Sequence, residues 1–142
     1  MTIAAEHPEL VRAVIVGDSA LYESTVDADM AVSYLANMPL AMRSLSKSLS
    51  QMDPVVMEVF RRGELTATYR PDETYRAISC PVLLLQGNGD KGAVMTDEDV
   101  ERALRLFRDV RHVKFDDLGH GLHVENPDAV LEQVTPFLRQ NV

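Results

Sequence analysis

A histidine between two glycines is the residue of this sequence best suited to chemistry. The stretch DDLGHGLHVENP, residues 116–127, places His120 between Gly119 and Gly121. Glycines on both sides let the backbone turn sharply and leave the imidazole accessible. An accessible imidazole serves as a general base when a carboxylate holds one ring nitrogen and the other is free to take a proton. His120 is therefore the first candidate catalytic residue.

The turn GNGDKG, residues 87–92, supplies a candidate carboxylate. Asp90 follows a strand-like apolar run and precedes His120 by thirty positions, with one helix and one strand expected between them. Sites in α/β folds lie at the carboxyl ends of parallel strands, and a right-handed crossover brings the next strand to the same rim. We therefore expect Asp90 to be the acid that orients His120. The alternative, purely structural interpretation is that Asp90 forms a turn among the glycines.

Three strands and two long helices must position these residues. Apolar, β-branched or alternating runs predict strands at 11–16, 81–87 and 111–115, the first two buried on both faces. A helix is expected after Thr96 and another after Asn126, because each of these residues is a favoured N-cap. Pro136 predicts a kink or an early end in the second helix. Strands that alternate with helices predict an α/β fold with a parallel sheet.

Residues 22–77 interrupt this alternation. The segment lacks a strand pattern, is rich in methionine and predicts short helices at 28–37, 40–49 and 54–62. A parallel crossover needs only about a dozen residues, so the extra length predicts a helical insertion that covers a site.

Composition excludes several classes of partner. The 142 residues suffice for one domain, and the net charge of −8 argues against nucleic acid and anionic membrane surfaces. No apolar run approaches the roughly 18 residues of a membrane span, and the N-terminus does not resemble a signal peptide. The single cysteine, Cys80, rules out an internal disulfide and fits a reducing compartment. We expect a cytoplasmic protein.

Taken in order, three stretches resemble the C-terminal half of the α/β-hydrolases. AAEHPELVRAVIVGDSA resembles the end of the nucleophile helix and the next strand, ISCPVLLLQGNGD the strand that delivers the acid, and LGHGLHVENPDAVLEQVTPFL the histidine loop and last helix. The resemblance implies a partial α/β-hydrolase fold of about three parallel strands. Residues 1–21 and 78–142 would form the core and residues 22–77 a helical cap.

The resemblance also implies a Ser-Asp-His triad. His120 would be its base and Asp90 its acid. Asp18 is the alternative acid, because some branches of the family carry the acid after the strand that ends there. As a structural residue, Asp18 would merely cap the following turn.

The nucleophile of the family is missing from this sequence. No Gly-x-Ser-x-Gly turn occurs, Ser19 in GDSAL has one glycine only, and the oxyanion loop is absent. We therefore expect the chain to correspond to the C-terminal portion of such an enzyme and to have negligible activity alone. An unpaired edge beside residues 11–16 would pair with an N-terminal half or a second copy.

The expected function is hydrolysis of a small ester or related acyl compound, with no cofactor and no metal. The residues do not choose among esterase, lactonase, carbon–carbon hydrolase, epoxide hydrolase and dehalogenase. One alternative is a non-catalytic interaction or oligomerisation domain that reuses the fold. Another is an independent hydrolase whose nucleophile is Ser19.

The other candidate residues have plainer interpretations. His123 suits packing or a capping contact, and Glu125 suits a helix N-terminus, where the dipole favours an acid. His7 and His112 are expected to be solvated. No spacing typical of a zinc site is present.

Overall fold

The computed structural model describes residues 1–22, 55, 62 and 69–142. The chain divides into two units, residues 1–22 with 70–142, and residues 23–69. The first unit is described below, and it includes residues 70–77, which the sequence analysis assigned to the inserted block. The three short helices predicted at 28–37, 40–49 and 54–62 lie outside the described residues, apart from Val55 and Arg62.

A three-stranded parallel sheet lies at the centre of the described unit, as the sequence predicts. Its strands are β1 (Val14–Gly17), β2 (Val82–Gln86) and β3 (Val110–Lys114), in the spatial order β1-β2-β3. Val14 pairs with Val82, which pairs with Val110, so the strands begin level with one another. Their carboxyl ends therefore meet at one rim of the sheet.

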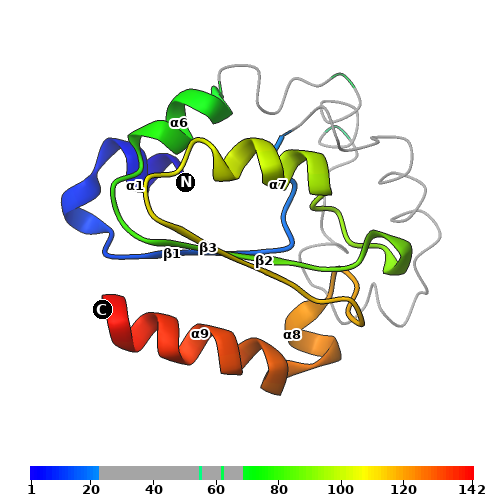
Figure 1. The fold of residues 1–142 in the computed structure, drawn as a ribbon. Coiled ribbons are helices and arrows are strands. Elements are labelled where there is room, and N and C mark those ends of the chain that lie inside the picture. The colour runs from blue at the N-terminus through cyan, green and yellow to red at the C-terminus, as the bar shows by residue number, and fades with distance from the viewer. Residues whose placement is uncertain (23–54, 56–61, 63–68) are drawn as a thin grey trace. The chain divides into compact units, whose positions relative to one another are not determined.

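Helices cover both faces of this sheet (Figure 1). On one face lie α1 (Thr2–Glu6), α6 (Pro71–Ala77) and α7 (Asp97–Leu104), and on the other α8 (Leu122–Glu125) and α9 (Pro127–Asn141). Two short 3₁₀ turns, η1 (Pro8–Leu10) and η3 (Gly89–Lys91), complete the unit. In the described part of the chain, no helix has the length and apolarity to cross a membrane.

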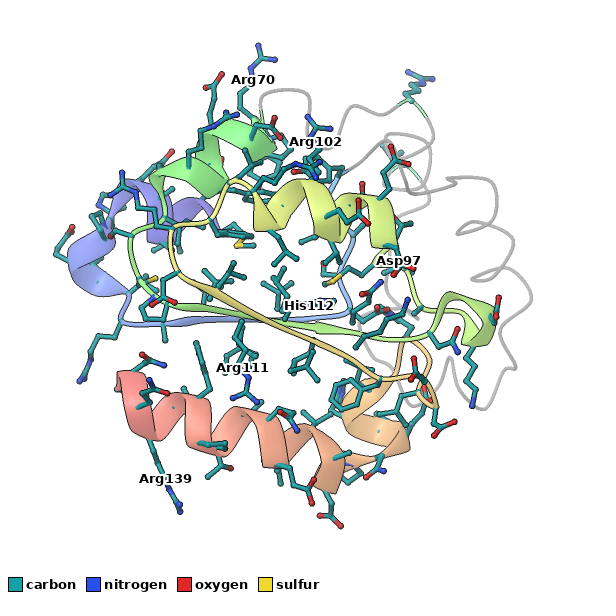
Figure 2. All side chains as sticks on the ribbon, viewed as in Figure 1. Arg70, Asp97, Arg102, Arg111, His112 and Arg139 are labelled. Carbon is teal, nitrogen blue, oxygen red and sulfur yellow. The ribbon has the colours of Figure 1, made fainter. Side chains whose placement is uncertain are left out.

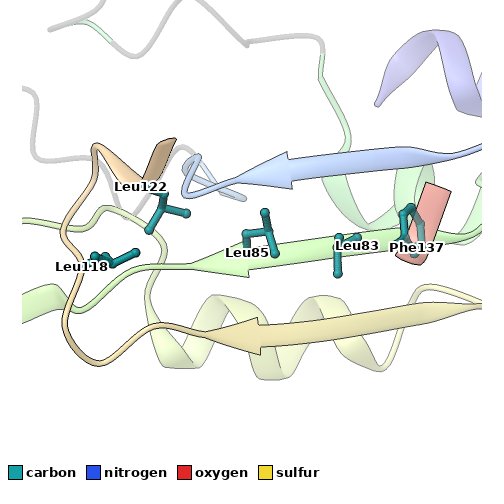
Figure 3. Packing of buried hydrophobic residues seen from close by; sticks show 5 residues of the cluster. All are labelled: Leu83, Leu85, Leu118, Leu122 and Phe137. Atoms are coloured by element: carbon teal, nitrogen blue, oxygen red, sulfur yellow. The ribbon is translucent and has the colours of Figure 1, made fainter. Parts of the chain in front are cut away.

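The core under α8 and α9 is built on alternate residues of β2. Leu83 and Leu85 pack with Leu118, Leu122 and Phe137, as Figure 3 shows. The intervening residues Val82, Leu84 and Gln86 point to the other face because strand side chains alternate. There Tyr75 of α6 stacks on Phe107, with ring centroids 4.9 Å apart.

Among the three described strands only β2 is buried on both faces, which corrects the expectation for β1. All five residues of β2 are buried, whereas Ile15 and Gly17 of β1 are exposed. The physical reason is position: within the described residues β1 has a neighbouring strand on one side only. No described residue pairs with its other edge.

Both predicted helix caps form. Thr96 accepts a hydrogen bond from the N–H of Asp99 at 3.2 Å, and Asn126 accepts one from Ala129 at 3.1 Å. The early end predicted at Pro136 does not occur, since α9 continues to Asn141. Pro136 and Glu132, whose carbonyl loses its helical bond, are both exposed residues.

Candidate active site

Asp18 lies where β1 ends, in an uncommon backbone conformation. Its φ is 36°, in the left-handed region that non-glycine residues visit rarely and Asp more readily than most. Its side chain is fully buried. Such strain persists where the surrounding structure fixes it, and it clusters at functional sites.

Backbone donors from two other segments surround the Asp18 carboxylate. One oxygen, Oδ1, accepts from the N–H groups of Gly87 at 3.0 Å and Met95 at 3.4 Å. The other, Oδ2, accepts from the N–H of Val94 at 2.8 Å. An ionised carboxylate suits these donors because it has acceptor sites only. The loop after β2 and the approach to α7 thus form a cradle for one buried negative charge.

His120 completes the set of donors. It follows β3, and its Nδ1 lies 2.9 Å from Oδ2 of Asp18. Because the carboxylate is an acceptor, Nδ1 carries the proton and Nε2 of a neutral ring keeps a lone pair. The His120 side chain is 61% exposed. Within the described residues Nε2 has no hydrogen bond, so it is available to take a proton from a reacting group.

Asp90 does not hold His120, and this corrects the first choice made from the sequence. Asp90 lies exposed in η3, where its own N–H donates to the Oδ1 of Asn88 at 2.9 Å. This local turn directs the residue to solvent. The carboxylate that meets the imidazole belongs to Asp18, the alternative acid. The two strand ends do share a rim, but the partner comes from β1 and not from β2.

A second polar network supports the cradle from the α7 side. Gln86, buried at the end of β2, donates to the carbonyl of Met95 at 3.0 Å and to Asp97 at 2.7 Å. Its remaining oxygen lies 2.8 Å from Nε2 of His112, which must therefore donate. Figure 2 shows His112 and Asp97 on this face of the sheet, while Arg111 points toward α9.

The titration of this network follows from its contacts. Burial lowers the pKa of His112, and the nearby Lys114 lowers it further. His112 is half-buried and hydrogen-bonded, so the expectation that it is solvated is wrong. The pKa of Asp97 is lowered, chiefly by the hydrogen bonds that Lys114 donates at 2.6 and 2.8 Å.

Glu125 contacts the histidine loop, a role that the sequence analysis missed. Its Oε2 accepts from the N–H of Gly119 at 2.8 Å and its Oε1 from the N–H of Gly121 at 3.0 Å. The sequence signal was the glycine pair itself, because two adjacent turns leave N–H groups that need an acceptor.

The other candidates lie away from the reacting nitrogen. Ser19 is exposed directly after Asp18 and makes no hydrogen bond to His120 within the described residues. His123 is exposed on α8, so the expectation that it packs is wrong. His7 is exposed as expected, 3.6 Å from Glu9. The described residues contain no group of three or more potential metal ligands.

The structure of this chain is similar to parts of several solved structures. The chain is similar to an E-2-(acetamidomethylene)succinate hydrolase, with a TM-score of 0.68 and 19% identity over 97% of this chain and 61% of that one. It is also similar to an esterase of Pyrococcus furiosus, with a TM-score of 0.63 and 15% identity over 97% and 47% of the two chains. A third similar structure is a carboxylesterase of Bacillus subtilis, with a TM-score of 0.63 and 22% identity over 97% of this chain and 55% of that one.

These similarities confirm the fold. Its three parallel strands with flanking helices match part of an α/β-hydrolase fold. The chain spans about half to three-fifths of the length of these solved structures. No family model matches the chain, and no curated protein matches it in sequence.

Proposed function

We propose that this chain carries the acid and the histidine of a serine-esterase-like α/β-hydrolase site that acts on a small ester or related acyl compound. The observation that carries the proposal is the bond between Nδ1 of His120 and the buried carboxylate of Asp18, with Nε2 left open. Asp18 takes the role of the acid, and Asp90 has none.

The chemistry follows from this pair. A serine hydroxyl attacks the carbonyl carbon of the substrate, and Nε2 of His120 takes the hydroxyl proton. Asp18 fixes the tautomer and stabilises the imidazolium that forms. His120 then gives the proton to the leaving alcohol. Water cleaves the acyl-enzyme with His120 again as base, which returns the serine and releases the acid.

The serine must come from a strand that pairs with the free edge of β1. A strand placed parallel beside β1 ends at the rim that holds Asp18 and His120, so its following turn reaches Nε2. The exposed Ile15 and Gly17 lie on this edge strand. Within the described residues no nucleophile is hydrogen-bonded to Nε2 of His120, so without that strand we expect the esterase activity of the 142-residue chain to be negligible.

The test compares the 142-residue chain with an extended chain that includes the sequence encoded immediately upstream of Met1. Turnover of a small activated ester is expected from the extended chain and not from the shorter one. In the extended chain, His120→Ala is expected to lower kcat by about 10³–10⁴-fold. Asp90→Asn is the matched control and should keep kcat within about twofold.

Two outcomes contradict the proposal. One is an upstream reading that encodes no Gly-x-Ser-x-Gly turn, and the other is ester turnover that survives His120→Ala. Turnover by the 142-residue chain that is lost in Ser19→Ala would establish an independent hydrolase instead.

A second candidate function is a non-catalytic interaction domain, which the free edge of β1 favours. An unpaired strand edge is a template for another strand. This function requires a stable complex formed through β1 without ester turnover. Size measurement of the purified 142-residue chain, with and without Ile15→Lys, is read together with the turnover assay. A stable complex that Ile15→Lys weakens, with no ester turnover from the extended chain, favours the interaction domain.

A further inference from the structure

The histidine loop has two sets of anchors, one before His120 and one around it. Before His120, the N–H of Asn88 donates to the carbonyl of Leu118 at 2.7 Å, and the side chain of Lys91 donates to the carbonyl of Asp117 at 2.9 Å. These bonds fix the loop to the turn after β2. They end one residue before the glycine that precedes the imidazole.

Around His120 the side-chain acceptor is Glu125. Its two oxygens accept from the residues immediately before and after the histidine, Gly119 at 2.8 Å and Gly121 at 3.0 Å. A bidentate carboxylate on two N–H groups is a charge-assisted contact, about twice as strong as a neutral pair. One side chain therefore fixes both peptide units that determine where the imidazole points.

The space around the two glycines is tight, above all at Gly119. A Cβ on Gly119 would collide with the carbonyl oxygen of Lys91 and would lie 3.2 Å from Oε1 of Glu125. A Cβ on Gly121 would also lie 3.2 Å from that oxygen. The loop is thus held closely between the β2 turn on one side and the Glu125 carboxylate on the other.

We propose that Glu125 is a positioning residue, whose carboxylate clamps Gly119 and Gly121 so that Nδ1 of His120 stays on Asp18. Glu125 acts through the backbone of the loop, not on the substrate. The consequence for catalysis rests on the proposed function, whereas the clamp itself is a property of the 142-residue chain. The clamp and the proposed function can therefore be contradicted by different results.

The first experiment measures the clamp without any activity. In the ¹⁵N-labelled 142-residue chain, the Nδ1 proton of His120 should give a downfield resonance, and the amides of Gly119 and Gly121 should exchange slowly. Glu125→Ala is expected to broaden or remove that resonance and to accelerate both amides about tenfold or more. Glu125→Gln keeps one acceptor oxygen, so a smaller acceleration, concentrated on one glycine, is expected.

Two references separate local loosening from unfolding. Asp128→Ala is the matched control, because Asp128 is an exposed acid in the first turn of α9 and accepts no hydrogen bond from the loop within the described residues. The amides of the central strand, such as Leu84, report the global fold and should keep their exchange rates in every variant. If Glu125→Ala leaves the Nδ1 resonance and both glycine amides unchanged, the clamp does not exist. Acceleration of the Leu84 amide to the same extent would likewise contradict a positioning role.

The second experiment tests the link to catalysis in the extended chain. Glu125→Ala should lower kcat for ester hydrolysis about tenfold with KM within about twofold, because substrate binding does not involve the clamp. If Glu125→Ala loosens the loop but the extended chain shows no turnover, the proposed function is contradicted and the clamp stands. Unchanged kcat in an active extended chain would overturn the positioning role alone.

Discussion

Two carboxylates lie at the ends of neighbouring parallel strands, and they differ in burial and in hydrogen-bond partners. Asp18 after β1 is fully buried, with donors 69 to 102 positions away along the chain. Asp90 after β2 is exposed, and its backbone N–H bonds to a residue two positions away. The comparison teaches that a strand-end acid becomes a site only when other segments bring donors to it.

The Asp18 region is also the one that stores strain. A φ of 36° on a non-glycine residue costs free energy, which the surrounding hydrogen bonds offset. The turn of Asp90 places its positive φ at Gly92, where it carries no such penalty. We therefore expect substitutions near Asp18 to lower the free energy of unfolding more than substitutions near Asp90.

Asp18→Asn is expected to be the most destabilising change. Asn has nearly the same shape and accepts a positive φ, but its NH₂ group would face a backbone N–H or the Nδ1 proton of His120. Loss of these bonds should lower the free energy of unfolding by about 2–4 kcal/mol, measured by urea denaturation. Asp90→Asn should change it by less than about 0.5 kcal/mol. Equal losses at the two positions would break the comparison.

A second matched pair uses the glycines of the same loop. A Cβ at Gly87 would collide with the carbonyl oxygen of Gly119 and lie 2.9 Å from the Cβ of Ala93, whereas Gly89 has no atom within 4 Å of such a Cβ. Gly87→Ala should therefore lower the free energy of unfolding by about 1–3 kcal/mol in thermal denaturation. Gly89→Ala should keep it within about 0.5 kcal/mol or raise it slightly. A harmless Gly87→Ala would mean that the histidine loop is not packed against the Asp18 cradle.

The smallest expected effect is a pH dependence that His112 adds through the Gln86 network. Its pKa is lowered in the folded protein, mainly by burial, so the unfolded chain binds the proton first as the pH falls. Its contribution to stability is complete above the ordinary value of 6.5 and is lost as the pH drops from there through the lower folded-state pKa. His112→Gln, which does not titrate, should show a shallower loss of unfolding free energy between about pH 7 and about pH 5. Parallel curves for the two proteins would contradict the assignment.

Much of the fold was predictable because its signals are local. The apolar run of β2, the N-caps Thr96 and Asn126 and the histidine between glycines each depend on residues within a few positions. The sequence also placed the candidate base and a carboxylate on one rim, since parallel strands that follow one another through helices share that edge.

The choice of acid was not predictable in the same way. Asp18 and Asp90 each follow an apolar run and a glycine, so their local patterns are similar. The difference lies in the N–H groups of Gly87, Val94 and Met95, which only the packed loop aims at Asp18. The same holds for His112, whose ring bonds to Gln86 of the neighbouring strand, a contact that its own flanking residues do not predict.

By itself, then, the sequence determined the parallel α/β pattern and the exposed histidine, because hydrophobic period and glycine content act over a few residues. Tertiary structure alone decided which carboxylate the imidazole meets. That outcome depends on hydrogen bonds between segments that are distant along the chain, and their directions exist only once the strands have paired.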